Sequence, residues 1–151
     1  MKEFNNINDI LDFAIGEEQA AVDFYLQLAA QSKSRQTKKI FEEYAEEEMR
    51  HKANLLSIKE SGSFKLADEK VRDLKIAEYL VDIRPSANMS YQDALILAMK
   101  KEKAAFRMYT KLAEKAESPD VKALFLNLAQ EESKHKLAFE VEYDEFILKE
   151  N

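Results

Sequence analysis

The feature that most constrains the fold of this chain is an internal repeat at an offset of 84 residues. Residues 14–55 align with residues 98–139 without a gap, and 15 of the 42 aligned positions are identical. A repeat of this length indicates two similar structural halves. The rarest repeated residues are one glutamate and one Glu-x-x-His motif per half: Glu18, Glu48 and His51 in the first, and Glu102, Glu132 and His135 in the second.

Each half is predicted to be a helical hairpin. The chain has only two Gly and two Pro, which favours long helices over a turn-rich β fold. Apolar residues recur at alternating steps of three and four, which is the spacing of one buried helix face. We therefore predict an all-α fold with helices over residues 8–33, 37–60, 90–117 and 118–149.

Capping residues support the predicted ends of these helices. Ser90 is the expected cap of the third helix, with Asp93 three residues further on. Ser118-Pro119-Asp120 places a cap residue first, then proline at the first helical position, then an acid in the first turn. The first hairpin turn, at residues 32–36, has weaker signals but lies at the aligned place.

Residues 61–89 join the two hairpins and form a long crossover. A connection of this length without structure of its own is unusual. Its apolar pattern predicts a short helix and consists of Val71, Leu74, Ile76, Tyr79, Leu80 and Ile83. The expected architecture is an antiparallel four-helix bundle with one crossover, and we expect a single domain over residues 1–151.

The repeated glutamates and histidines are predicted to lie on the buried faces of their helices. The apolar stripe of each helix is interrupted only by a Glu, or by a Glu and a His. Residues equidistant from the turn of an antiparallel hairpin lie at the same level. The midpoints fall near residues 34 and 118, where the turns are expected. All six side chains should therefore meet in one layer of the core.

Four carboxylates in one core layer need compensating charge, because a buried unpaired charge costs several kcal/mol. No Lys or Arg lies near that level on the buried faces. Two divalent cations would balance the four carboxylates, with neutral imidazoles completing their coordination. Oxygen and imidazole ligands without sulfur suit iron or manganese, with zinc as an alternative. The interpretation without metal is a helical bundle that keeps a vestigial site.

Residues near the six candidate ligands have two interpretations each. Tyr25 and Tyr109 lie seven residues after the first repeated glutamate of each half. They are either core filler or phenols that donate a hydrogen bond to a ligand carboxylate. Glu47 and Glu131 precede the histidines by four residues. A solvated helix face is the favoured interpretation for them, and a contact that supports a metal ligand is the alternative.

Composition limits the classes of function. A net charge of −6 argues against nucleic acid as a partner, since phosphate binding needs a basic face. The absence of cysteine excludes disulfides, thiolate nucleophiles and cysteine-ligated metals. The N-terminus lacks the features of a signal peptide, and the longest apolar run, residues 94–99, is too short to span a bilayer. We therefore expect a cytoplasmic protein without membrane partners.

The motifs together resemble the ferritin-like di-iron carboxylate proteins, which place one Glu on each of two helices and Glu-x-x-His on each of the other two. Within this superfamily the chain is most similar to the rubrerythrins, over about residues 8–146. The resemblance implies a ferritin-like fold and two iron ions held by the six residues. The resemblance implies that Glu48 and Glu132 bridge the two irons and that Glu18 and Glu102 are terminal ligands. It also implies that His51 binds one iron and His135 the other.

The resemblance also implies an activity, with two departures. Rubrerythrins typically reduce hydrogen peroxide with electrons from a rubredoxin-like domain, which binds iron through cysteines. This chain has no cysteine, so the expected electron donor is a separate rubredoxin-like protein. The family carries an extra glutamate three residues after the ligand of the third helix, and here that position is Ala105. The family's exchange of iron ligands depends on that glutamate.

Three functions remain open from the sequence. The first is a di-iron oxidoreductase that reduces hydrogen peroxide or dioxygen with electrons from an external donor. The second is an iron-binding or ferroxidase protein that handles iron without peroxidase turnover. The third is a structural bundle with a vestigial metal site. Because relatives associate through helix faces, we also expect a homodimer or a larger homo-oligomer.

Overall fold

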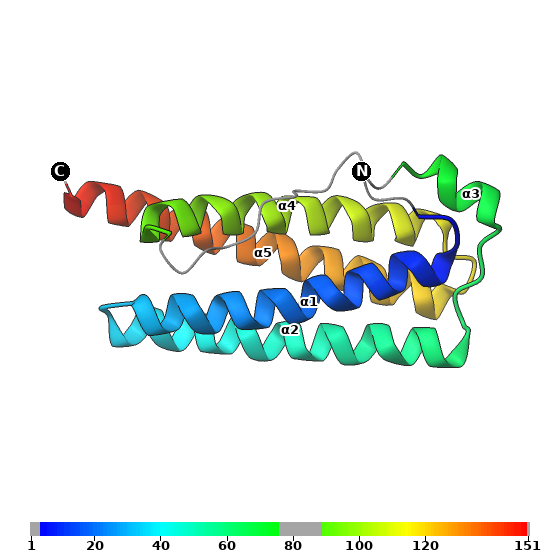
Figure 1. Ribbon diagram of the computed structural model, residues 1–151, viewed down its shortest axis with the longest axis horizontal. Coiled ribbons are helices and arrows are strands. Elements are labelled where there is room, and N and C mark those ends of the chain that lie inside the picture. The colour runs from blue at the N-terminus through cyan, green and yellow to red at the C-terminus, as the bar shows by residue number, and fades with distance from the viewer. Residues whose placement is uncertain (1–3, 76–88, 151) are drawn as a thin grey trace.

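The computed structural model describes residues 4–75 and 89–150, and over these ranges it contains helices and no strand. The helices are α1 (Ile7–Gln31), α2 (Arg35–Ser61), α3 (Asp68–Asp73), α4 (Tyr91–Lys115) and α5 (Pro119–Glu150). Figure 1 shows α1 lying along α2 and α4 lying along α5, as two hairpins side by side. The predicted all-α bundle of two hairpins is confirmed. None of the described helices is long and apolar enough to cross a membrane.

The long helices begin at residues that cap their free N–H groups. The side chain of Ser90 accepts a hydrogen bond from the N–H of Asp93 at 3.1 Å, as predicted. Ser118 accepts one from the N–H three residues further on at 3.5 Å, and Pro119 is the first residue of α5. Ser34 caps α2 in the same way, so α2 begins two residues earlier than predicted.

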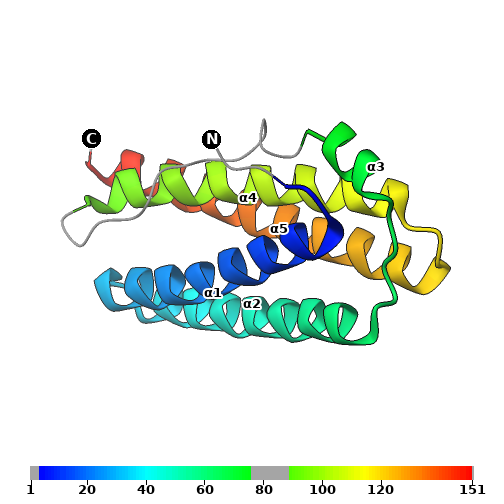
Figure 2. The same cartoon turned by 45° about the vertical axis from the view of Figure 1, so that its right-hand side comes forward.

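The crossover carries the short helix α3, and its apolar residues pack onto the end of the bundle. Val71 and Leu74 are buried in the same apolar cluster as Phe64. Phe64 lies edge-on against Phe125 of α5, with ring centroids 5.3 Å apart. Figure 1 and Figure 2 show the chain running from the end of α2 across the end of the bundle to α3. The rest of the predicted apolar pattern, Ile76, Tyr79, Leu80 and Ile83, lies outside the described residues.

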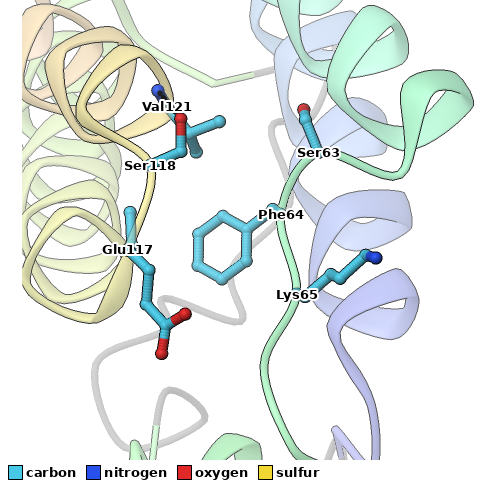
Figure 3. A pocket seen from close by; sticks show the side chains of 7 residues that line it. Ser63, Phe64, Lys65, Glu117, Ser118 and Val121 are labelled. Carbon is cyan, nitrogen blue, oxygen red and sulfur yellow. Dashed lines mark hydrogen bonds between the residues drawn. The ribbon is translucent and has the colours of Figure 1, made fainter.

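A pocket lies at this end of the bundle, between the crossover and the start of α5. Figure 3 shows Phe64 pointing from the crossover toward the α4–α5 loop. The lining residues are Ser63, Phe64, Lys65, Ala116, Glu117, Ser118 and Val121. None of the repeated glutamates or histidines is among them, so this pocket is separate from the predicted site.

The described core consists of two apolar clusters, one toward each end of the bundle. The first includes Leu11, Leu55 and Leu112, and the second includes Leu28 and Phe41. In every long helix, the repeated glutamate or Glu-x-x-His motif falls between the residues of one cluster and those of the other. The predicted polar layer therefore lies at mid-height in the bundle, with apolar packing at both ends.

Candidate metal centre

The structure brings all six repeated residues together in the core. They come from four helices, because α1 and α4 each supply one glutamate, and α2 and α5 each supply a Glu-x-x-His motif. Among the described residues they are the only buried polar or charged side chains, each at most 3% exposed. They are Glu18, Glu48, His51, Glu102, Glu132 and His135.

The Glu-x-x-His spacing places both side chains of each motif on one helix face. The Nδ1 atom of His51 lies 3.5 Å from Oε1 of Glu48 on the same helix. It also lies 2.8 Å from Oε1 of Glu132 on α5 and 3.6 Å from Oε2 of Glu18 on α1. These short separations place carboxylates from three helices around one imidazole nitrogen.

The second histidine has matching surroundings. The Nδ1 atom of His135 lies 3.1 Å from Oε1 of Glu48 and 3.8 Å from Oε2 of Glu102. The six residues thus form two groups, in each of which the possible ligand atoms lie within 4.8 Å of one another. The groups are Glu18, Glu48, His51 and Glu132, and Glu48, Glu102, Glu132 and His135. Because Glu48 and Glu132 belong to both, two ions held here would share two carboxylates.

Each of the six residues has one buried polar atom that lacks a hydrogen-bond partner. These atoms are Glu18 Oε2, Glu48 Oε1, His51 Nδ1, Glu102 Oε2, Glu132 Oε1 and His135 Nδ1. Leaving one buried polar atom unpaired costs about 1–3 kcal/mol, and six together are too costly to be incidental. Four oxygens and two imidazole nitrogens are also ligands that iron and manganese accept. The donor set therefore fits divalent cations.

The outer nitrogen of each histidine contacts a glutamate of the opposite helix. His51 Nε2 pairs with Glu131 of α5, and His135 Nε2 pairs with Glu47 of α2. These contacts favour the alternative interpretation of the two glutamates as supports of the histidines, although both remain about one-third exposed. A carboxylate accepts a hydrogen bond from Nε2–H, which leaves the Nδ1 lone pair directed at the centre.

The sequence repeat marks Glu47 and Glu131 as a matched pair, but it does not show which histidine each one contacts. Glu47 and Glu131 are identical across the repeat. Their spacing of four residues from the histidine of their own helix, however, suggests a partner on the same helix. The real partner is the histidine of the other helix, which no spacing within one helix can indicate.

One of the two repeated tyrosines donates to a candidate ligand. The hydroxyl of Tyr109 donates to Oε1 of Glu18 at 2.5 Å, from α4 to α1. Burial and the negative charges of Glu18 and Glu132 raise the pKa of Tyr109 well above its usual value, so the hydroxyl keeps its proton. Tyr25 packs against Phe139 with ring centroids 5.3 Å apart, which agrees with the interpretation of this tyrosine as core filler.

Without metal, the layer must hold protons in place of cations. Burial and the negative charge of Glu132 raise the pKa of Glu48 and Glu102 well above the usual value. For Glu132 the effect of burial is outweighed by the neighbouring side chains of Glu102 and His51, which lower its pKa to about 2. Burial lowers the pKa of His51, but the nearby carboxylates of Glu132 and Glu18 raise it to about 11. The carboxylate layer therefore attracts positive charge strongly.

The fold and the centre together define a class: antiparallel helical bundles that can hold a pair of metal ions in the core. The family model of rubrerythrin matches residues 9–143, and the chain therefore belongs to the rubrerythrin family. The predicted ferritin-like, rubrerythrin-type bundle is thereby confirmed.

One solved structure supports the same fold. It is a hypothetical protein from Pyrococcus furiosus, which is 26% identical with a TM-score of 0.69. The match covers 89% of this chain and 85% of that one. The search of curated proteins gives no significant match.

Proposed function

We propose that the centre binds two iron ions and reduces hydrogen peroxide or dioxygen with electrons from an external donor. The observation that carries this proposal is the pair of ligand groups that share Glu48 and Glu132, with all six inward atoms unpaired. Membership of the rubrerythrin family supports iron as the metal. Iron, when bound, supplies the electrons and the Lewis acidity for the reduction.

The residues of this chain would bind, orient and isolate the ions. Glu18 and Glu102 each belong to one group, which suits a terminal role. The glutamates on the outer histidine nitrogens hold the imidazoles in the orientation that presents Nδ1. Tyr109 holds Glu18 through its hydroxyl. The apolar clusters at either end keep water from the layer.

The proposal places the electron donor outside these 151 residues, because they contain no cysteine for a rubredoxin-like iron site. Ala105 offers no carboxylate, so the proposed reduction does not include a change of ligand at that position. The absence of a carboxylate at position 105 favours the second candidate function, iron oxidation and handling without peroxidase turnover.

We also propose a homodimer or larger homo-oligomer, which a light-scattering mass in solution would test.

The first experiment is an anaerobic Fe(II) titration of metal-stripped protein beside Glu132→Gln and Glu46→Gln. Glu132 belongs to both ligand groups, whereas Glu46 is an exposed glutamate on α2. We expect two irons per chain in the wild type and in Glu46→Gln, and loss of at least one in Glu132→Gln. No tight binding in the wild type would leave only the vestigial bundle.

A second measurement separates the two iron functions. The di-iron(II) protein is mixed with hydrogen peroxide or with dioxygen, and the oxidation rate and the fate of the iron are followed. Faster oxidation by peroxide, with iron retained and reduced again by a donor, supports the peroxidase. Equal rates with release of iron would select iron handling instead.

A further inference from the structure

The two halves of the centre differ at one repeated position beside the histidines. Tyr44 on α2 aligns with Leu128 on α5 at the offset of 84 residues. The ring of Tyr44 stacks on the imidazole of His135, with centroids 4.1 Å apart and planes 28° apart. Leu128 is fully buried and has no ring to offer. The repeat symmetry of the centre is therefore broken around its histidines.

The ring of His135 is held from three directions. Tyr44 stacks on one face, and Tyr25 lies edge-on with centroids 6.2 Å apart. Glu47 contacts its Nε2 atom, as Glu131 contacts that of His51, so the two aromatic rings are what distinguishes His135. In the part of the chain that the structure describes, the ring beside His51 is that of His135 itself, 6.5 Å away. The imidazole of His135 is thus the more constrained of the two before any ion binds.

We propose that Tyr44 makes the two metal positions unequal, so that the position of Glu102 and His135 binds a divalent ion more tightly and fills first. This inference rests on the proposed function, because it requires that both groups bind metal. The physical reason is preorganisation: an imidazole already fixed in its binding orientation loses less side-chain freedom when the ion binds. An aromatic pair is worth about 0.5–1.5 kcal/mol, which limits the effect to roughly two- to tenfold in Kd.

The aromatic ring, and not the hydroxyl, carries the effect. Tyr44→Phe keeps the stacked ring, whereas Tyr44→Leu introduces the residue that the other half has at the aligned position. Tyr44 is half-buried, and its ring also packs on Tyr25 and Phe139 of the second core cluster, so Tyr44→Phe, which keeps these ring contacts, is the control for packing. The two variants therefore separate ring stacking from hydrogen bonding.

The test uses Mn²⁺ as the probe, with free Mn²⁺ measured by electron paramagnetic resonance. His51→Ala and His135→Ala each leave one complete position. We expect His51→Ala, which keeps the stacked histidine, to bind Mn²⁺ about two- to tenfold more tightly than His135→Ala. Adding Tyr44→Leu should weaken binding by that factor in the His51→Ala background and leave His135→Ala unchanged. Tyr44→Phe should change neither.

Two results would overturn the inference: equal affinity in the two single-position variants, or equal weakening by Tyr44→Leu in both. If the histidine variants do not bind at all, the intact protein decides. Mn²⁺ binding to the wild type should then require two dissociation constants that differ by about two- to tenfold and become equal in Tyr44→Leu, and equal constants in the wild type contradict the inference. Absence of any binding to the wild type would instead refute the proposed function.

Discussion

Two pairs of glutamates that adjoin in the sequence have opposite surroundings. Glu48 and Glu132 are at most 2% exposed, whereas Glu47 and Glu131 are 33% and 31% exposed. The buried pair belongs to both ligand groups, and the partly exposed pair contacts the outer nitrogens of the histidines. One step along a helix turns the side chain by about 100°, which is enough to separate a ligand position from a supporting one.

Replacement of Glu131 by glutamine should weaken metal binding without removing a ligand. The variant keeps the size of the side chain and loses the negative charge beside His51 Nε2. Such supporting residues typically contribute about 10- to 100-fold to metal affinity. The Mn²⁺ dissociation constant checks this, with exposed Glu46→Gln as the control. An affinity equal to that of the wild type would show that Glu131 does not support the centre.

Replacement of Tyr109 by phenylalanine should destabilise the metal-free protein. The ring keeps its place beside Phe125, with centroids 6.1 Å apart, but Oε1 of Glu18 loses its donor in the core. We expect the free energy of unfolding in urea to fall by about 1.5–3 kcal/mol. Tyr25→Phe is the companion variant, and a smaller loss is expected there because the ring packs in the core as filler. No loss in Tyr109→Phe would mean that its hydroxyl bond does not stabilise the fold.

At the scale of elements, α2 and α5 are connected crosswise through the centre. Each presents a glutamate to the histidine of the other, and each supplies a carboxylate common to both ligand groups. The two helices belong to different hairpins, so these contacts hold one hairpin against the other.

The two glycines occupy opposite kinds of helix position. Gly62 ends α2 with φ of 65°, and its N–H donates to the carbonyl of Ile58 at 3.1 Å. Gly16 lies inside α1, where an added Cβ would meet no neighbouring side chain within 4 Å. We expect Gly62→Ala to destabilise by about 1 kcal/mol and Gly16→Ala to stabilise by about 0.5–1 kcal/mol. Urea unfolding of both variants checks the opposite signs, and equal signs would contradict this assignment.

At the scale of the whole molecule, the metal-free protein holds protons that its unfolded chain would release. Glu48 and Glu102 have a pKa raised by burial, above the usual 4.5. The pKa of His51 is raised to about 11, above the usual 6.5, despite the opposing effect of burial. Glu132, with its pKa lowered to about 2, affects stability only below the usual glutamate pKa. At pH values above the usual glutamate pKa, the raised pKa values of Glu48, Glu102 and His51 therefore lower the free energy of unfolding as the pH rises.

The free energy of unfolding of the metal-free protein should fall between about pH 5 and pH 8. Bound divalent ions replace the protons, so the metal-loaded protein should lose much less over the same range. Urea unfolding with chelator and with excess Mn²⁺ checks both statements. Glu48→Gln should reduce the fall and Glu46→Gln should not, which separates the core layer from general repulsion. A metal-free protein that gains stability toward pH 8 would contradict the argument.

Four long helices, the repeat and the six buried residues follow from the sequence alone. Helix periodicity and turn chemistry are local, and a constant repeat offset relates the two halves without any knowledge of packing. For this reason the sequence predicts the buried stripes that run through Glu18 and Glu102. It also predicts that the six side chains lie in one layer of the core. Helix ends differ by one or two residues because caps such as Ser34 act at single positions.

Contacts between residues of different helices follow only from the three-dimensional packing. The pairing of His51 with Glu131, the bond from Tyr109 to Glu18 and the stacking of Tyr44 on His135 all cross between helices. Such contacts depend on how far apart two helices pack and how each is rotated about its axis. A periodic pattern places a side chain on a face of its own helix, but it contains no information on which neighbour that face meets.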